Sequence, residues 1–177
     1  EMDYMSFSHG VIDGCDVIVC RTGYSGEHGY EVLPRWTEAS KVWDAIYSKL
    51  GDGLVCGLGA RDTLRTEMGY PLHGHELSLE ITPLEASASW AIVMSKENFH
   101  GKEALLKQKS AGLTRRVRGL KSLDRGIPRA GMAVLNQAGE NVGIVTSGTF
   151  SPTLKSGIAL ALIKPEITVG STLKIDI

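Results

Sequence analysis

Three glycines spaced three apart lie in the stretch RTGYSGEHGYE, residues 21–31, which ends on the carboxylate of Glu31. One interpretation is a phosphate-binding loop, but such a loop leads from a strand into a helix N-terminus. Here YEVL resumes a strand pattern, and the stretch has no lysine. The other interpretation is a wide hairpin turn whose glycines allow positive φ. The residues alone favour the turn, and they leave Glu31 open as a ligand-binding carboxylate or an ordinary one at a strand end.

Arg61 is the second residue whose position is unusual. In the helix predicted by GLGARDTLRTEMG, a turn of about 100° per residue places Arg61 beside Leu64 and Met68 rather than opposite them. An unpaired buried charge is costly, so this arginine needs a partner. The partner is either a ligand or an acidic side chain, with Asp62 and Glu67 as the structural alternatives.

A metal site is not expected. His73 and His75 alternate, but no Cys/His cluster with zinc spacing accompanies them. The three cysteines, Cys15, Cys20 and Cys56, form no CxxC pair, and their odd number argues against a disulfide framework. A reducing compartment is therefore expected, the bacterial cytoplasm or the mitochondrial matrix.

Composition sets broad limits on function. The 177 residues are 42% hydrophobic and 22% charged, with a net charge of -1, which is typical of a soluble folded protein. Neither nucleic-acid binding nor membrane binding is expected from this balance, and no apolar run is long enough to span a bilayer. Both ends interrupt apparent structure, so we expect the chain to be part of a longer protein.

Secondary-structure patterns indicate an α+β chain. Helices are predicted at 38–50, 58–68 and 102–109 from their apolar periodicity. The remaining elements read as strands, and the last five are short and separated by Gly, Pro and Ser turns, which is typical of a small barrel. The predicted strands are 14–20, 30–33, 88–94, 115–120, 130–136, 141–147, 157–163 and 171–177.

Five motifs in order give a more specific identification. They are RTGYSGEHGYE, GLGARDTLRTEMG, PLHGHEL, ITPLEASASW and TSGTFSPTLK. Together they resemble the T-protein family of the glycine cleavage system, the aminomethyltransferases, and the resemblance covers nearly the whole chain. Departures are small: Thr66 and Met68 replace the usual Leu and Ala, and His73 stands where many members have Tyr.

The resemblance implies a fold of mostly antiparallel sheet with flanking helices and a small C-terminal β-barrel, within a three-domain cloverleaf around a folate cavity. Residues 1–80 would belong to a middle α+β folate-binding domain, 81–112 to a segment returning to the first domain, and 113–177 to an incomplete barrel. The implied reaction moves an aminomethyl group from a lipoyl carrier protein, the H-protein, to tetrahydrofolate, and ammonia is released.

Site residues follow from the same resemblance. Glu31 matches the family's pterin-binding glutamate, since a carboxylate can accept two adjacent N–H donors at once. Arg61 matches its partner arginine, Trp90 is a candidate for stacking on the pterin, and Tyr70 and Tyr24 are candidates for the cavity wall. No residue of this chain matches the catalytic aspartate, which the family carries in its N-terminal half.

One charge bias and two alternatives remain. Residues 96–129 contain ten Lys or Arg and three acids. They form either a solvated face or a surface for an acidic partner such as a folate tail or the carrier protein.

The first alternative function is a folate-binding relative without transferase activity, an assembly factor or the folate domain of an amine dehydrogenase or demethylase. The second is a structural or nucleic-acid-binding barrel, which the near-neutral charge disfavours.

Overall fold

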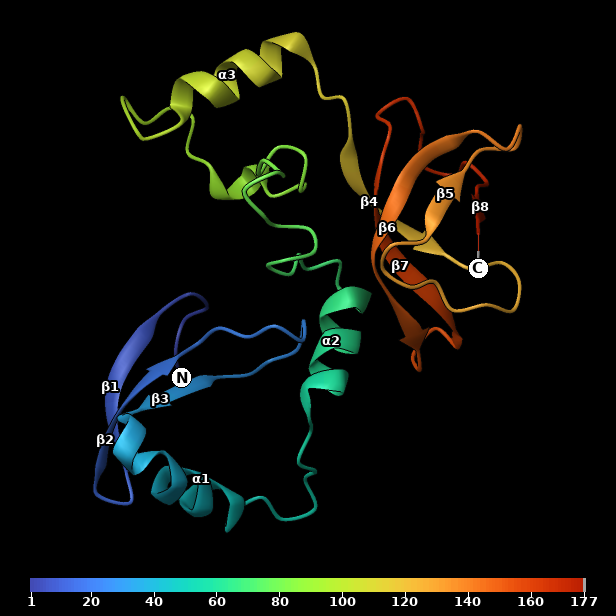
Figure 1. The fold of residues 1–177 in the computed structure, drawn as a ribbon. Helices are drawn as coiled ribbons and strands as arrows, with labels where there is room; N and C mark the ends of the chain where they lie inside the picture. Colours follow the sequence, from blue (N-terminus) through green and yellow to red (C-terminus); the bar gives the residue numbers. More distant parts are fainter. Residues whose placement is uncertain (177) are drawn as a thin grey trace. The chain divides into compact units, whose positions relative to one another are not determined.

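The structure, a computed structural model, describes residues 1–176. They form two compact units, one over residues 1–64 and one from Arg65 onward, whose helices and strands are labelled in Figure 1. Each unit has its own antiparallel sheet, with three strands in the first and five in the second. The prediction of an α+β chain with mostly antiparallel sheets and a few helices is confirmed.

The first unit is built on the sheet order β1-β2-β3. Strand β1, Phe7–Ile12, was not predicted from the sequence. Its signal is the pair Asp13 and Gly14, whose φ angles of +49° and +76° make the two-residue hairpin turn into β2, Cys15–Cys20. Strand β3, Glu31–Pro34, then pairs with β2 and ends at the proline, as predicted.

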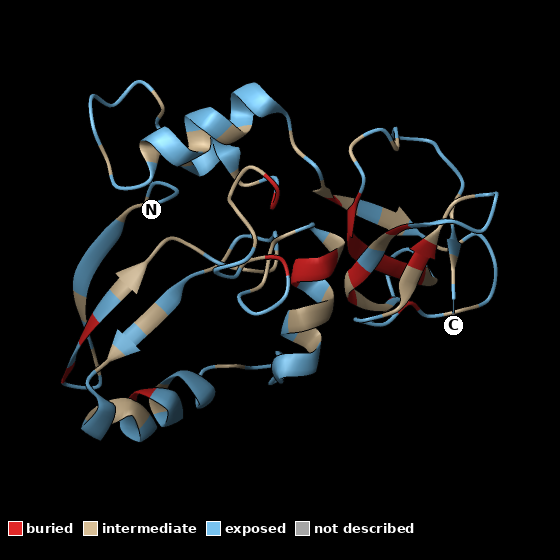
Figure 2. Ribbon diagram, turned by 45° about the horizontal axis from the view of Figure 1, so that its top comes forward, coloured by how far each residue is buried: buried red, intermediate tan, exposed pale blue. Residues whose placement is uncertain are grey.

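One face of this sheet is covered by a helix. After the 3-10 turn η1, Trp36–Glu38, helix α1 runs over Ala39–Tyr47 and places Val42 against Cys15 and Val17 in a small core. Because side chains alternate along a strand, the other sheet face carries exposed apolar residues. Figure 2 shows how few residues of this unit are buried.

Helix α2, Leu58–Glu67, contains the junction of the two units and confirms the helix predicted there. Helix α3, Lys102–Ala111, likewise confirms its prediction. Between them, the predicted strand at 88–94 is wrong. The amides of Ala91 and Ile92 donate to carbonyls three residues earlier, and the short 3-10 turn η2, Ser89–Ala91, forms instead. An apolar run becomes a strand only where a neighbouring strand pairs with it.

The second unit is built on the five-stranded antiparallel order β4-β7-β6-β5-β8. Most buried residues of the chain lie on these strands (Figure 2). The longest strand, β6, runs beyond its predicted end at 147 and includes the TSGTFS motif. Of the strand predicted at 171–177, only β8 forms, and residue 177 lies outside the described residues. The strands are β4 Arg116–Lys121, β5 Ala133–Leu135, β6 Asn141–Ser151, β7 Ser156–Ile163 and β8 Lys174–Ile175.

Candidate functional site

The glycine-rich stretch joins β2 to β3, as its strand-like flanks predicted. The phosphate-loop interpretation is wrong, because β3 follows the glycines where a helix N-terminus would be required. Gly26 has a φ of +80°, in the left-handed region that favours glycine. A side chain at Gly23 would meet nothing within 4 Å. The stretch is therefore an open, wide turn.

Arg21 holds the two ends of this turn together. Its Nη1 donates to the carbonyl oxygen of Gly29 at 3.2 Å. Its guanidinium carbon also lies 5.7 Å from the ring centroid of Tyr4 and 5.6 Å from that of Tyr30, at cation–π distance. The arginine of the motif thus has a structural role within the loop.

Glu31 is the first residue of β3 and lies directly opposite Cys20 of β2. Its side chain is exposed, and Oε2 accepts a hydrogen bond from the hydroxyl of Thr22. The carboxylate is therefore accessible from solvent and held from one side.

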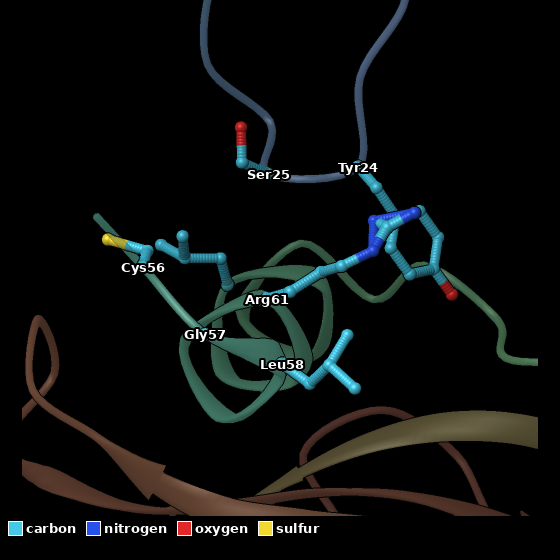
Figure 3. Close-up of a pocket in the computed structure, with 7 residues that line it drawn as sticks. Tyr24, Ser25, Cys56, Gly57, Leu58 and Arg61 are labelled. Carbon is cyan, nitrogen blue, oxygen red and sulfur yellow. The ribbon is translucent and has the colours of Figure 1, made fainter. Parts of the chain in front are cut away.

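Tyr24 and Arg61 come together although they belong to different motifs. The guanidinium carbon of Arg61 lies 4.6 Å from the centroid of the Tyr24 ring, and Figure 3 shows the two side chains reaching the same place from different segments. They line an open pocket of about 350 Å³. The full lining is Tyr24, Ser25, Cys56, Gly57, Leu58, Arg61 and Leu64, of which Glu31 is not a member.

The expectation of a buried partner for Arg61 is corrected. Arg61 is exposed, and the arginine that lies buried in α2 is Arg65, one turn later, with 1% of its surface accessible. Glu67, one of the acids considered for Arg61, accepts hydrogen bonds from the hydroxyls of Ser151 and Thr153. The buried and paired arginine of this helix is therefore Arg65, which the sequence argument did not single out.

Arg65 belongs to a buried polar cluster in the second unit. Its Nη1 lies 3.0 Å from Oε2 of Glu76, and its Nη2 donates to the Ser147 hydroxyl at 2.8 Å. That hydroxyl donates in turn to Oε1 of Glu76 at 2.6 Å, and the amide of Leu72 donates to Oε2 at 2.9 Å. Glu76 is 0% and Ser147 3% exposed. Three of the sequence motifs therefore meet in one network, none of whose members was predicted as a site residue.

The other predicted site residues lie in the second unit. Trp90, in η2, is 79% exposed. Tyr70 is half-buried, and its carbonyl oxygen accepts from Nη1 of Arg65 at 3.2 Å. His75 donates through Nδ1 to the carbonyl of Thr146 at 2.7 Å. Within residues 1–176, no three His, Cys, Asp or Glu side chains are grouped to hold a metal ion.

The basic stretch has both paired and exposed members. Arg115 forms an ion pair with the buried carboxylate of Glu85, Nε to Oε1 at 2.9 Å. Burial alone raises the pKa of Glu85, but the Arg115 hydrogen bond and the backbone N–H of Thr82 outweigh it and hold the pKa below its usual value. Lys107 and Lys109 are exposed on α3.

Among residues 1–176, every helix is too short or too polar to cross a lipid bilayer.

Comparison with known proteins extends these observations. Residues 1–96 match the family model of the GCVT N-terminal domain, and residues 115–177 match that of the glycine cleavage T-protein C-terminal barrel domain. The second match confirms the predicted C-terminal barrel. The domain bounds at 80 and 112 and the cloverleaf stay predictions.

Individual relatives agree with the family match. The chain is 54% identical to an aminomethyltransferase of Parafrankia sp. and 53% identical to one of Mycobacterium tuberculosis, over 98% and 100% of its length. A crystal structure of the glycine cleavage system aminomethyltransferase T from Bartonella henselae superposes on the whole chain with a TM-score of 0.89 at 31% identity. The chain spans about half the length of these relatives, 48% and 49% of the two curated proteins and 49% of the solved one. It belongs to the glycine cleavage T-protein family.

Proposed function

We propose that this chain supplies the folate-binding portion of a tetrahydrofolate-dependent aminomethyltransferase of the glycine cleavage system. In this reaction a nitrogen of tetrahydrofolate attacks the methylene carbon of an aminomethyl group carried on a lipoyl arm, and ammonia leaves. The family membership and the names of the relatives support the reaction class.

The observation that supports folate binding most is the pairing of Tyr24 with Arg61 at one open pocket. A planar guanidinium at cation–π distance from an aromatic ring supplies cationic and aromatic groups suited to a flat heterocycle. Glu31 would accept the N–H donors of the pterin edge, the ring amide and the exocyclic amino group, through a charge-assisted pair. The roles expected for Trp90 and Tyr70, which belong to the second unit, stay predictions.

The partner of the reaction is proposed to be a lipoyl carrier, the H-protein. Lys107 and Lys109 project from α3 into solvent, within a stretch of ten cations and three acids. Such a surface attracts acidic partners, and both a folate polyglutamate tail and an acidic carrier would qualify.

No catalytic group is assigned to residues 1–177. Transfer requires a group near the folate nitrogens that orients the attacking amine and handles its proton. We assign that role to an aspartate in the part of the family that this chain does not match.

The test uses tetrahydrofolate, a loaded lipoyl carrier and two samples. One is residues 1–177 alone; the other, the complemented protein, is residues 1–177 mixed with a polypeptide matching the first half of a curated relative. We expect ammonia release from the complemented protein only. Release by residues 1–177 alone would contradict this division and point to Asp62 or His73, while folate binding without turnover would favour a non-transferase relative.

A further inference from the structure

Thr22 is the residue whose side chain contacts the carboxylate of Glu31, and its own function is otherwise unexplained. We infer that Thr22 is a positioning residue, whose hydroxyl orients the Glu31 carboxylate before a ligand arrives. The inference rests on the proposed function for the identity of the ligand, but the orientation of Glu31 is testable without any ligand.

Strand register explains why these two side chains meet. Glu31 pairs directly with Cys20 across β2 and β3. Thr22 lies two residues beyond Cys20, where β2 has ended, and its hydroxyl still reaches the Glu31 carboxylate. The hydrogen bond therefore spans the two ends of the glycine-rich turn.

The backbone of Thr22 is held in place by its neighbour. Arg21 donates to the carbonyl of Gly29, and its guanidinium lies at cation–π distance from the rings of Tyr4 and Tyr30. Thr22 is half-buried, whereas Glu31 is exposed. We therefore take the half-buried Thr22 hydroxyl as the group that orients the exposed carboxylate of Glu31.

The bond also leaves the carboxylate free to bind. An ionised carboxylate has two oxygens with about four acceptor positions and no donor. Thr22 occupies one position on Oε2, so Oε1 and the remaining position on Oε2 can accept two parallel N–H donors. A side chain ordered in advance loses less freedom when the ligand binds, which raises affinity without any contact between Thr22 and the ligand.

Two substitutions separate the hydroxyl from the shape of the side chain. Thr22→Val keeps the branched shape and removes the donor, while Thr22→Ser keeps the donor. Thr37→Val changes an exposed threonine of the same unit and serves as the control. All three variants are expected to melt within a few degrees of the wild type.

The first measurement is ligand-free. Three-bond NMR couplings of the Glu31 side chain are expected to report one dominant rotamer in the wild type, Thr22→Ser and Thr37→Val, and rotamer averaging in Thr22→Val. Equal couplings in Thr22→Val and the wild type overturn the inference, whether or not folate binds.

The second measurement is a tetrahydrofolate titration of the complemented protein. We expect Thr22→Val to raise Kd roughly three- to tenfold, Thr22→Ser to restore it, and Thr22→Val to have no further effect in a Glu31→Ala background. An unchanged Kd in Thr22→Val, or an equal loss in the Glu31→Ala background, overturns the positioning role. A wild type that binds no tetrahydrofolate refutes the proposed function instead, and the couplings then decide the role of Thr22 by themselves.

Discussion

Arg65 and Glu76 form an ion pair in which both side chains are almost completely buried, with Nη1 3.0 Å from Oε2. A pair of this kind is costly to desolvate, and breaking it leaves one buried charge without its partner. Ser147 contacts both members, so the pair also fixes the last turn of α2 against β6. We interpret it as a determinant of which packing the second unit adopts.

Single and double substitutions of this pair should be strongly non-additive. Arg65→Ala and Glu76→Ala are each expected to lower the free energy of unfolding by about 3–5 kcal/mol, and the double variant by much less than the sum. Urea unfolding measures this. Glu140→Ala, which removes an exposed carboxylate bonded to Asn136, is the control and should cost under about 1 kcal/mol. Additive losses would mean that the two side chains act independently.

Glu85 should make stability depend on pH. Because its pKa is lowered in the folded protein, its contribution is fully present above the unfolded value of about 4.3 and is lost as pH falls through the folded value. Glu85→Gln is therefore expected to be destabilised by about 1–2 kcal/mol at pH 7 and to approach the wild type near pH 3. Denaturation curves across this range measure the difference, with exposed Glu166→Gln as the control. A difference in the free energy of unfolding between the wild type and Glu85→Gln that does not change with pH would contradict the ion pair with Arg115.

Much of the fold was predictable, for physical reasons that differ by element. Helix α2 and the C-terminal strands follow from local periodicity. Strand β1 depends on its pairing with β2, and the apolar run at Trp90 found no strand to pair with, so periodicity alone failed for both. The residues of the candidate site likewise differ in how far they could be predicted. Glu31 and Arg61 came from the family motifs, whereas Arg65 and Thr22 depend on contacts between segments that no single-sequence pattern encodes.

Arg61 should require its planar shape as well as its charge. Arg61→Lys is expected to weaken tetrahydrofolate binding about tenfold, because lysine cannot stack its head group flat on Tyr24. The melting temperature should hardly change, because Arg61 is exposed. Calorimetric titration of the complemented protein measures the effect. If Arg61→Lys binds normally and Arg61→Ala only lowers the melting temperature, the arginine is structural.

Lys107 and Lys109 should steer the acidic partner. Reversing both to Glu is expected to raise the apparent KM for the carrier at low salt and to matter less at high salt, where screening is strong. The control reverses Lys49 and Lys164 to Glu. This changes the net charge by the same amount, but both residues lie outside the basic stretch. A salt-independent effect, or equal effects of the two double variants, would return these lysines to an ordinary solvated surface.

The role of Glu31 as the acceptor of the pterin N–H donors is tested most directly by the affinity of the complemented protein for tetrahydrofolate. A hydrogen bond to a charged group contributes about 1.5–3 kcal/mol. Glu31→Ala and Glu31→Gln are therefore expected to raise Kd roughly ten- to a hundredfold while both variants remain folded. Folded variants that bind tetrahydrofolate as tightly as the wild type would contradict the assignment of Glu31 to the folate site.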